Sequence, residues 1–240
     1  MSLPLFFHDE LNALPGDFLL KEDTARHIVQ VLRMQPGELL HLTDGKGLFA
    51  TARITATGKK RCEVKLTELD QVAAPQPGLH LAIAFTKNSS RNEWLLEKAT
   101  EMGVTSIIPL MAHRSERIPA IKDRWRNILI AAILQSRQAW LPELAEPANP
   151  EQILQHFAAI PQKLLAHCIP GLTRLPLKEA LLPGRATLIL IGPEGDFTPE
   201  EVDLCTKAGC SGIGLGTTRL RTETAAMVAT AYFNLINSEV

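Results

Sequence analysis

The chain has 240 residues, 45% of them apolar, and a formal net charge of −1 at pH 7. This length and apolar content are enough for one large or two smaller hydrophobic cores, and we favour two domains. The near-neutral charge gives no support to a nucleic-acid or membrane partner held by overall electrostatics, so any RNA contact must depend on local basic groups.

The four cysteines have no spacing typical of a zinc site. They are Cys62, Cys168, Cys205 and Cys210, with no CxxC pair among them. We therefore expect reduced thiols and no metal. No stretch approaches the roughly 18 apolar residues that would span a bilayer, and no charged-then-apolar leader opens the chain. These features predict a soluble, cytoplasmic protein without a membrane partner.

Residues 17–69 consist of short alternating apolar segments that are separated by turn residues. The period-2 alternation over residues 48–54 is typical of half-buried strands, and Asp44-Gly45 is a hairpin turn signal. Only residues 22–34 have helical periodicity, and Pro36-Gly37 ends that pattern. We predict a small β-barrel-like domain with one helix.

A linker with two prolines and a glycine follows at residues 70–78. We place the domain boundary there and predict domains over residues 1–73 and 74–240. In the second domain, strands alternate with helices, which predicts α/β class with a mostly parallel sheet covered on both faces. We expect helices over 89–102, 122–139, 150–159, 198–208 and 222–237, and strands over 79–86, 105–110, 163–168, 187–191 and 211–216.

Ligands of open α/β sheets bind beyond the carboxyl ends of the strands, so the loops after strands are candidate sites. Three loops are rich in glycine or charge: the segment after "KLLAHC", "GPEGD" at 192–196, and "GTTRLRTET" at 216–224. The phosphate-binding patterns GxGxxG and GxxxxGK[ST] do not occur there. Glycine spacing alone leaves both turns and ligand contact open.

The pairing of "LIGPEGDFTPEE" with "GLGTTRLRTETAA" resembles the 16S ribosomal RNA uracil-N3 methyltransferases of the SPOUT class. The resemblance extends to "KNSSRNEWLLEKATEMGV" and to the amino-terminal "HIVQVLRMQPGELLHLTDGKG", so it covers almost the whole chain. The sequence departs from the family pattern at Asp196, where the family has glycine, and at Thr218-Arg219, where it has Arg-Ile.

The resemblance implies an amino-terminal RNA-binding domain of PUA-like barrel type and a carboxy-terminal SPOUT methyltransferase domain with a trefoil knot. It also implies S-adenosylmethionine as methyl donor, a homodimer, and 16S rRNA of the 30S subunit as substrate. Two alternatives stay open. One is another SPOUT RNA methyltransferase that acts on a tRNA or rRNA ribose 2′-hydroxyl, and the other is a non-catalytic RNA-binding protein of ribosome assembly.

The resemblance also suggests roles for residues in the two motifs. Arg221 is the candidate that stabilises negative charge on the deprotonated uracil. Glu194 either orients the cofactor or the base, or only hydrogen-bonds its own turn. We expect Glu223 to have a structural role, because it lies in the first turn of a predicted helix, where a negative charge is favourable. The candidate cofactor-binding residues are Ile191, Gly192, Gly195, Leu215, Gly216 and Leu220, whose backbone would approach the cofactor closely.

Basic groups that could bind RNA phosphates occur in both domains. Residues 87–126 carry eight basic and five acidic side chains, a local charge of 8 − 5 = +3. Lys87 and Arg91 stand out because they follow the carboxyl end of a predicted strand. In the first domain, Arg26 and Arg33 lie on the predicted helix, and we take all four as candidate RNA-binding residues.

Overall fold

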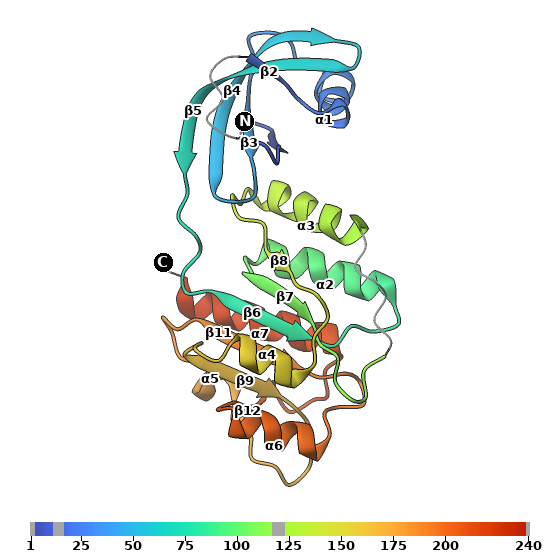
Figure 1. Cartoon of the computed structure of the whole chain (residues 1–240), viewed down its shortest axis with the longest axis vertical. Helices are drawn as coiled ribbons and strands as arrows, with labels where there is room; N and C mark the ends of the chain where they lie inside the picture. Colours follow the sequence, from blue (N-terminus) through green and yellow to red (C-terminus); the bar gives the residue numbers. More distant parts are fainter. Residues whose placement is uncertain (1–2, 12–16, 117–122, 239–240) are drawn as a thin grey trace. The chain divides into compact units, whose positions relative to one another are not determined.

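The computed structural model describes residues 3–11, 17–116 and 123–238. It divides into two compact units (Figure 1). The amino-terminal unit comprises Met1–Ala74 and Ile133–Leu141, and the carboxy-terminal unit comprises Pro75–Ala132 and Pro142–Val240. A later segment of the chain therefore completes the amino-terminal unit. No helix among the described residues is long and apolar enough to cross a membrane.

The amino-terminal unit is built on a five-stranded sheet with the order β1-β3-β4-β5-β2. Its strands are β1 (Leu5–Phe7), β2 (Asp17–Leu19), β3 (Leu39–Thr43), β4 (Leu48–Gly58) and β5 (Arg61–Gln71). The pairs β3–β4, β4–β5 and β2–β5 are antiparallel, while β1 runs parallel to β3. Alternate side chains of the strands, including Leu40, Leu42 and Val64, form a buried core with the helical segment. The predicted small sheet domain is thus confirmed.

The helix of this unit is shorter than predicted. An α-helical turn, α1 (Glu22–Arg26), continues as a π-helical segment, η1 (His27–Val31). Arg33 then has a φ of 56°, in the left-handed region that ends a right-handed helix. The prediction that Arg33 lies on the helix was therefore wrong, since the backbone turns before Pro36-Gly37.

The carboxy-terminal unit contains a sheet of seven parallel strands with the order β10-β12-β9-β11-β6-β7-β8. These are β6 (Leu79–Ile83), β7 (Ser106–Pro109), β8 (Glu143–Leu144), β9 (Gln162–Ala166), β10 (Leu175–Pro176), β11 (Thr187–Ile191) and β12 (Ser211–Gly214). Every residue of β11 is buried, as its unbroken apolar sequence predicts for a central strand. The short β8 and β10 lie at the two edges and had no periodic signal.

Further helices follow β6 in the described part of the chain. They are α2 (Ser89–Glu101), α3 (Asp123–Ser136), α4 (Pro150–His156), α5 (Leu177–Ala180), α6 (Pro199–Lys207) and α7 (Thr222–Asn237). Side chains of α4 and α6 share a buried cluster with Leu188 and Leu190 of β11, whereas α7 packs on α2, β6 and β11. The predicted α/β class with a parallel sheet is confirmed.

The carboxyl ends of three neighbouring strands, β12, β9 and β11, lie on the same side of the sheet because the strands are parallel. The loops that follow them span residues 167–174 (first loop, after β9), 192–198 (second loop, after β11) and 215–221 (third loop, after β12). The second loop leads into α6, where Thr198 caps the helix: its hydroxyl accepts from Glu201 N, and the Glu201 carboxylate accepts from Thr198 N. This side of the sheet therefore brings together loops that lie far apart in the sequence.

Candidate active site

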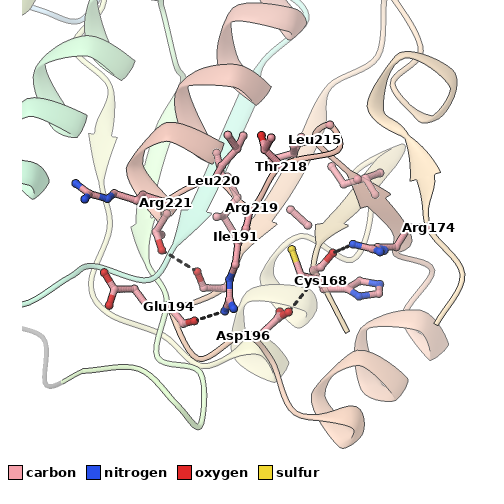
Figure 2. Close-up of a pocket in the computed structure, with 18 of the residues that line it drawn as sticks. Cys168, Arg174, Ile191, Glu194, Asp196, Leu215, Thr218, Arg219, Leu220 and Arg221 are labelled. Atoms are coloured by element: carbon pink, nitrogen blue, oxygen red, sulfur yellow. Dashed lines mark hydrogen bonds between the residues drawn. The ribbon is translucent and has the colours of Figure 1, made fainter. Parts of the chain in front are cut away.

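A pocket of about 470 Å³ lies among the three loops at the carboxyl ends of β9, β11 and β12. We call it the main pocket. Apolar side chains and loop backbone form its central part, as Figure 2 shows for Ile191, Leu215 and Leu220. Five of the six predicted cofactor-binding residues line it: Ile191, Gly192, Leu215, Gly216 and Leu220. The sixth, Gly195, lines a second pocket instead.

The glycines of the main pocket have different structural reasons. Gly216 has a φ of 125°, which disfavours any residue with a side chain, and among the described residues no atom lies within 4 Å of a Cβ placed there. At Gly192, a Cβ would lie 2.7 Å from the Phe197 ring, which is itself fully buried. Gly192 is thus required by the protein's own packing, a reason that the sequence pattern did not reveal.

Arg221 and Glu194 lie at one side of the main pocket. Figure 2 shows both side chains on the side opposite Cys168 and Arg174. Arg221 is the N-cap residue of α7, and its guanidinium has no ion-pair partner among the described residues. Figure 2 shows the Arg221 side chain directed away from Ile191 and Leu215, so this cation without an ion-pair partner lies at the rim of the main pocket.

Glu194 takes part in an ion-pair network that reaches beyond its own turn. Its carboxylate lies 3.8 Å from Arg91 Nη1, and Arg91 Nε lies 3.4 Å from Oε1 of the buried Glu223. Arg91, on α2, thus lies between carboxylates from the second loop and from the first turn of α7. Glu223 lies in the first turn of α7 and pairs with Arg91. Both features suit the structural role that the sequence predicted, because a negative charge is favourable near a helix N-terminus.

A second pocket, of about 240 Å³, adjoins the main pocket and shares Pro193 and Glu194 with it. We call it the basic pocket because Lys87, Arg91 and Arg114 line it. The Lys87 ammonium lies 2.9 Å from the Glu116 carboxylate. Arg114 Nη1 donates to the carbonyl oxygen of Gly195 at 2.8 Å. The structure therefore brings the predicted Lys87 and Arg91 into one pocket with Glu194.

The first loop adds pocket residues whose importance the sequence patterns did not indicate. His167, Cys168 and Arg174 line the main pocket, and Arg174 Nη1 donates to the His167 carbonyl oxygen at 2.9 Å. Burial lowers the pKa of His167 below its usual value, against an opposing effect of the Asp196 carboxylate. The sequence had marked this loop as a candidate only by its position after a strand and its glycine or charge content, not by these residues.

The two candidate RNA-binding residues of the amino-terminal unit are both exposed. Arg26 pairs with Glu22 at 3.3 Å and with Asp23 at 3.4 Å, both on the same helix. Arg33 lies beyond the helix end and forms no ion pair within the described part of the chain. Arg33 is thus the less compensated of these two cations.

Two family models match the chain. An RNA methyltransferase domain matches residues 74–234, and an RNA methyltransferase PUA domain matches residues 20–67. The first model alone spans more than half of the chain. The PUA match falls within the amino-terminal sheet unit, in agreement with the PUA-like fold predicted for it.

Individual relatives agree with these models. The chain is 32% identical over 216 residues to the ribosomal RNA small subunit methyltransferase E of Synechocystis, which covers 88% of this chain and 70% of that protein. A crystal structure described as a "probable rRNA-methyltransferase" of Porphyromonas gingivalis matches with a TM-score of 0.90 and 36% identity, over 98% of both chains.

A ribosomal RNA small subunit methyltransferase E of Neisseria gonorrhoeae, bound to S-adenosyl methionine, matches with a TM-score of 0.83 and 29% identity over 98% of both chains. The fold and these matches all indicate an RNA methyltransferase, and the pocket among the three loops offers space for a cofactor. The chain belongs to the family of RNA methyltransferases that includes ribosomal RNA small subunit methyltransferase E.

Proposed function

We propose that the protein transfers the methyl group of S-adenosylmethionine to N3 of a uridine in 16S rRNA of the small ribosomal subunit. The observation that carries this proposal is the pairing of two adjoining pockets. The main pocket combines apolar side chains with loop backbone, and the basic pocket carries three cationic side chains against the two carboxylates of Glu116 and Glu194. Two adjoining sites of this kind suit a small cofactor and an anionic polymer.

The residues of the main pocket fit S-adenosylmethionine, which supplies an activated methyl group. Ile191, Leu215 and Leu220 offer an apolar surface for the adenine, and the loop backbone offers hydrogen-bonding groups for its edge. Arg174 provides a positive charge for the carboxylate of the cofactor's amino-acid part. All six predicted cofactor-binding residues, including Gly195 in the second loop, would contribute to this site.

Arg221 is the proposed catalytic residue. Uridine N3 becomes nucleophilic when it loses its imide proton, and the resulting negative charge spreads over N3 and the two carbonyl oxygens. A guanidinium without another partner is suited to stabilise that charge. Glu194 adjoins both pockets and is held near Arg91, so it would orient the acceptor base relative to the methyl donor.

RNA is proposed to enter through the basic pocket. Lys87 and Arg91 would neutralise phosphates beside the acceptor nucleotide, and exposed Arg26 and Arg33 would add phosphate contacts from the amino-terminal unit. The match to a PUA domain of RNA methyltransferases supports this role for the amino-terminal unit. We propose that residues 1–73 form an RNA-binding domain and that residues 74–240 form the methyltransferase domain, in which Lys87 and Arg91 also contact RNA.

The proposal extends to the assembly and its location. We expect a homodimer that acts on the 30S subunit in the cytoplasm. Analytical ultracentrifugation would test the dimer, with a single monomeric species as the contradicting result.

The substrate is tested by incubating the protein with S-adenosylmethionine that carries a labelled methyl group and with 30S subunits, naked 16S rRNA or tRNA. We expect 3-methyluridine in 16S rRNA after digestion to nucleosides. A label on ribose or on tRNA alone would assign the chain to another SPOUT activity. Absence of cofactor binding in calorimetry at millimolar concentration would favour a non-catalytic RNA-binding protein.

A further inference from the structure

The structure gives a common role to two of the residues at which this sequence departs from the family pattern. Asp196 replaces a glycine in the second loop, and Arg219 replaces an isoleucine in the third. Both line the main pocket. Each makes a hydrogen bond to a different loop, which neither glycine nor isoleucine could make through its side chain.

Asp196 joins the second loop to the first. Its φ of 64° lies in the left-handed region that glycine adopts freely and that aspartate tolerates better than most residues. One carboxylate oxygen, Oδ1, accepts from the neighbouring Phe197 N at 2.9 Å. The other, Oδ2, accepts from Cys168 N at 2.7 Å, across 28 positions of the sequence. The glycine conformation is therefore kept, and a bond between loops is added.

Arg219 joins the third loop to the second. Its Nη2 donates to the carbonyl oxygen of Glu194 at 2.8 Å. This bond and the one from Asp196 are both drawn in Figure 2, and both end on the second loop. Together they connect all three loops that form the main pocket.

A pocket made of separate loops loses conformational freedom when a ligand orders those loops, and this loss reduces affinity. Bonds that already hold the loops together in the free protein reduce the loss. We infer that Asp196 and Arg219 are positioning residues that hold the three loops of the main pocket in their ligand-binding arrangement before the methyl donor binds.

This inference rests on the proposed function for the identity of the ligand, but the bonds between loops can be tested without ligand. Amide hydrogen exchange in the free protein is the direct measurement. In Asp196→Gly, the Cys168 amide loses its acceptor, and we expect its exchange to accelerate about tenfold or more. In Asp196→Asn, the side-chain oxygen can still accept from Cys168 N, so exchange should stay close to that of the wild type.

Calorimetry with S-adenosylmethionine provides the second measurement. We expect the Kd to rise about tenfold in Asp196→Gly and about threefold in Arg219→Ile, with a less favourable binding entropy in both. Asp196→Asn keeps an acceptor oxygen for Cys168 N, and Arg219→Lys keeps a donor for the Glu194 carbonyl oxygen. Both variants should stay within about threefold of the wild type. At saturating cofactor, the single-turnover rate of Asp196→Gly should match that of the wild type.

Two results would overturn the inference. One is wild-type affinity and wild-type Cys168 exchange in Asp196→Gly. The other is an Asp196→Asn protein that binds as weakly as Asp196→Gly while Cys168 stays protected, which would place the carboxylate in direct contact with the ligand. Failure of the wild-type protein to bind S-adenosylmethionine would instead contradict the proposed function, and the exchange measurement would still report on the loops.

Discussion

Two glycine-rich loops, one in each unit, differ in what surrounds their glycines: the β3–β4 turn and the loop that begins at the end of β12. In the amino-terminal unit, Gly45 and Gly47 make room for the protein's own side chains: a Cβ at Gly47 would lie 2.6 Å from the Trp140 ring, and one at Gly45 would lie 2.9 Å from Leu141 Cβ. In the carboxy-terminal unit, Gly214 and Gly216 line the main pocket, and no described atom lies within 4 Å of a Cβ built there.

Strand direction explains this difference. The antiparallel β3 and β4 are joined directly by a tight turn, so their glycine-rich connection is packed against the same unit. The parallel strands β9, β11 and β12 end at one edge, so three connections converge there and leave a space between them. A glycine-rich loop therefore indicates a ligand site only when the topology leaves the space beside its glycines free of other protein atoms.

The largest expected effect comes from removing the uncompensated cation of the main pocket. Arg221→Ala should reduce the methylation rate about 100-fold or more, because the charge on the deprotonated uracil loses its stabilising partner. Cofactor affinity and thermal stability should stay unchanged. Single-turnover methylation and calorimetry would measure the two properties, and near-normal turnover would remove Arg221 from the mechanism.

Packing at Gly192 should have the next largest effect. Gly192→Ala places a Cβ 2.7 Å from the buried Phe197 ring, and such overpacking costs about 1–3 kcal/mol of unfolding free energy. The second loop would also shift, so cofactor affinity should fall. Denaturant unfolding and calorimetry would measure both effects.

Gly47→Ala is the matched control in the other unit. Its Cβ would clash with Trp140, and its φ of 99° adds backbone strain. Stability should fall by a similar amount without any change in cofactor affinity. If Gly47→Ala weakened cofactor binding as much as Gly192→Ala, the assignment of the cofactor to the loops of the main pocket would be wrong.

Smaller effects are expected for cations that contact RNA phosphates. Lys87→Ala should weaken RNA binding several-fold and reduce the slope of log K against log salt by about one. Arg33→Ala should do the same from the amino-terminal unit, and neither change should alter cofactor affinity. Filter binding of 16S rRNA over a range of salt concentrations would measure the slopes. An unchanged slope in either variant would exclude that residue from the phosphate contacts.

Histidines of both units should make stability depend on pH. Burial is the main cause that lowers the pKa of His8 and His41 in the amino-terminal unit and of His80 and His167 in the carboxy-terminal unit, each from 6.5. Below pH 6.5, the unfolded chain therefore binds protons that the folded chain does not. The unfolding free energy should fall as the pH drops below that value and should not change from this cause above it.

Thermal unfolding between pH 7.5 and 5.5 would measure this dependence. His80→Gln and His41→Gln remove one titrating group from each unit, and each should flatten the slope. A melting temperature that rises as the pH falls from 6.5 would contradict the sign.

The sequence alone was sufficient for the class of fold and for identifying the loops that line the main pocket. The buried run at 187–191 and the alternation of strands with helices reflect burial and periodicity, which are local properties, so β11 and α7 were predicted with the bounds they have. Short elements such as β8 and β10 have too few residues for a period, and their existence depends on pairing with neighbouring strands.

Only the tertiary structure decided which residues meet at the site. The bonds from Asp196 to Cys168 and from Arg219 to Glu194 join positions 28 and 25 residues apart, and no periodic pattern encodes such contacts. No periodic pattern reveals why residue 192 is glycine either, because the reason is that the Phe197 ring packs against it. Local chemistry therefore determined the strands and loops of this protein, and the parallel topology determined how those loops combine into a pocket.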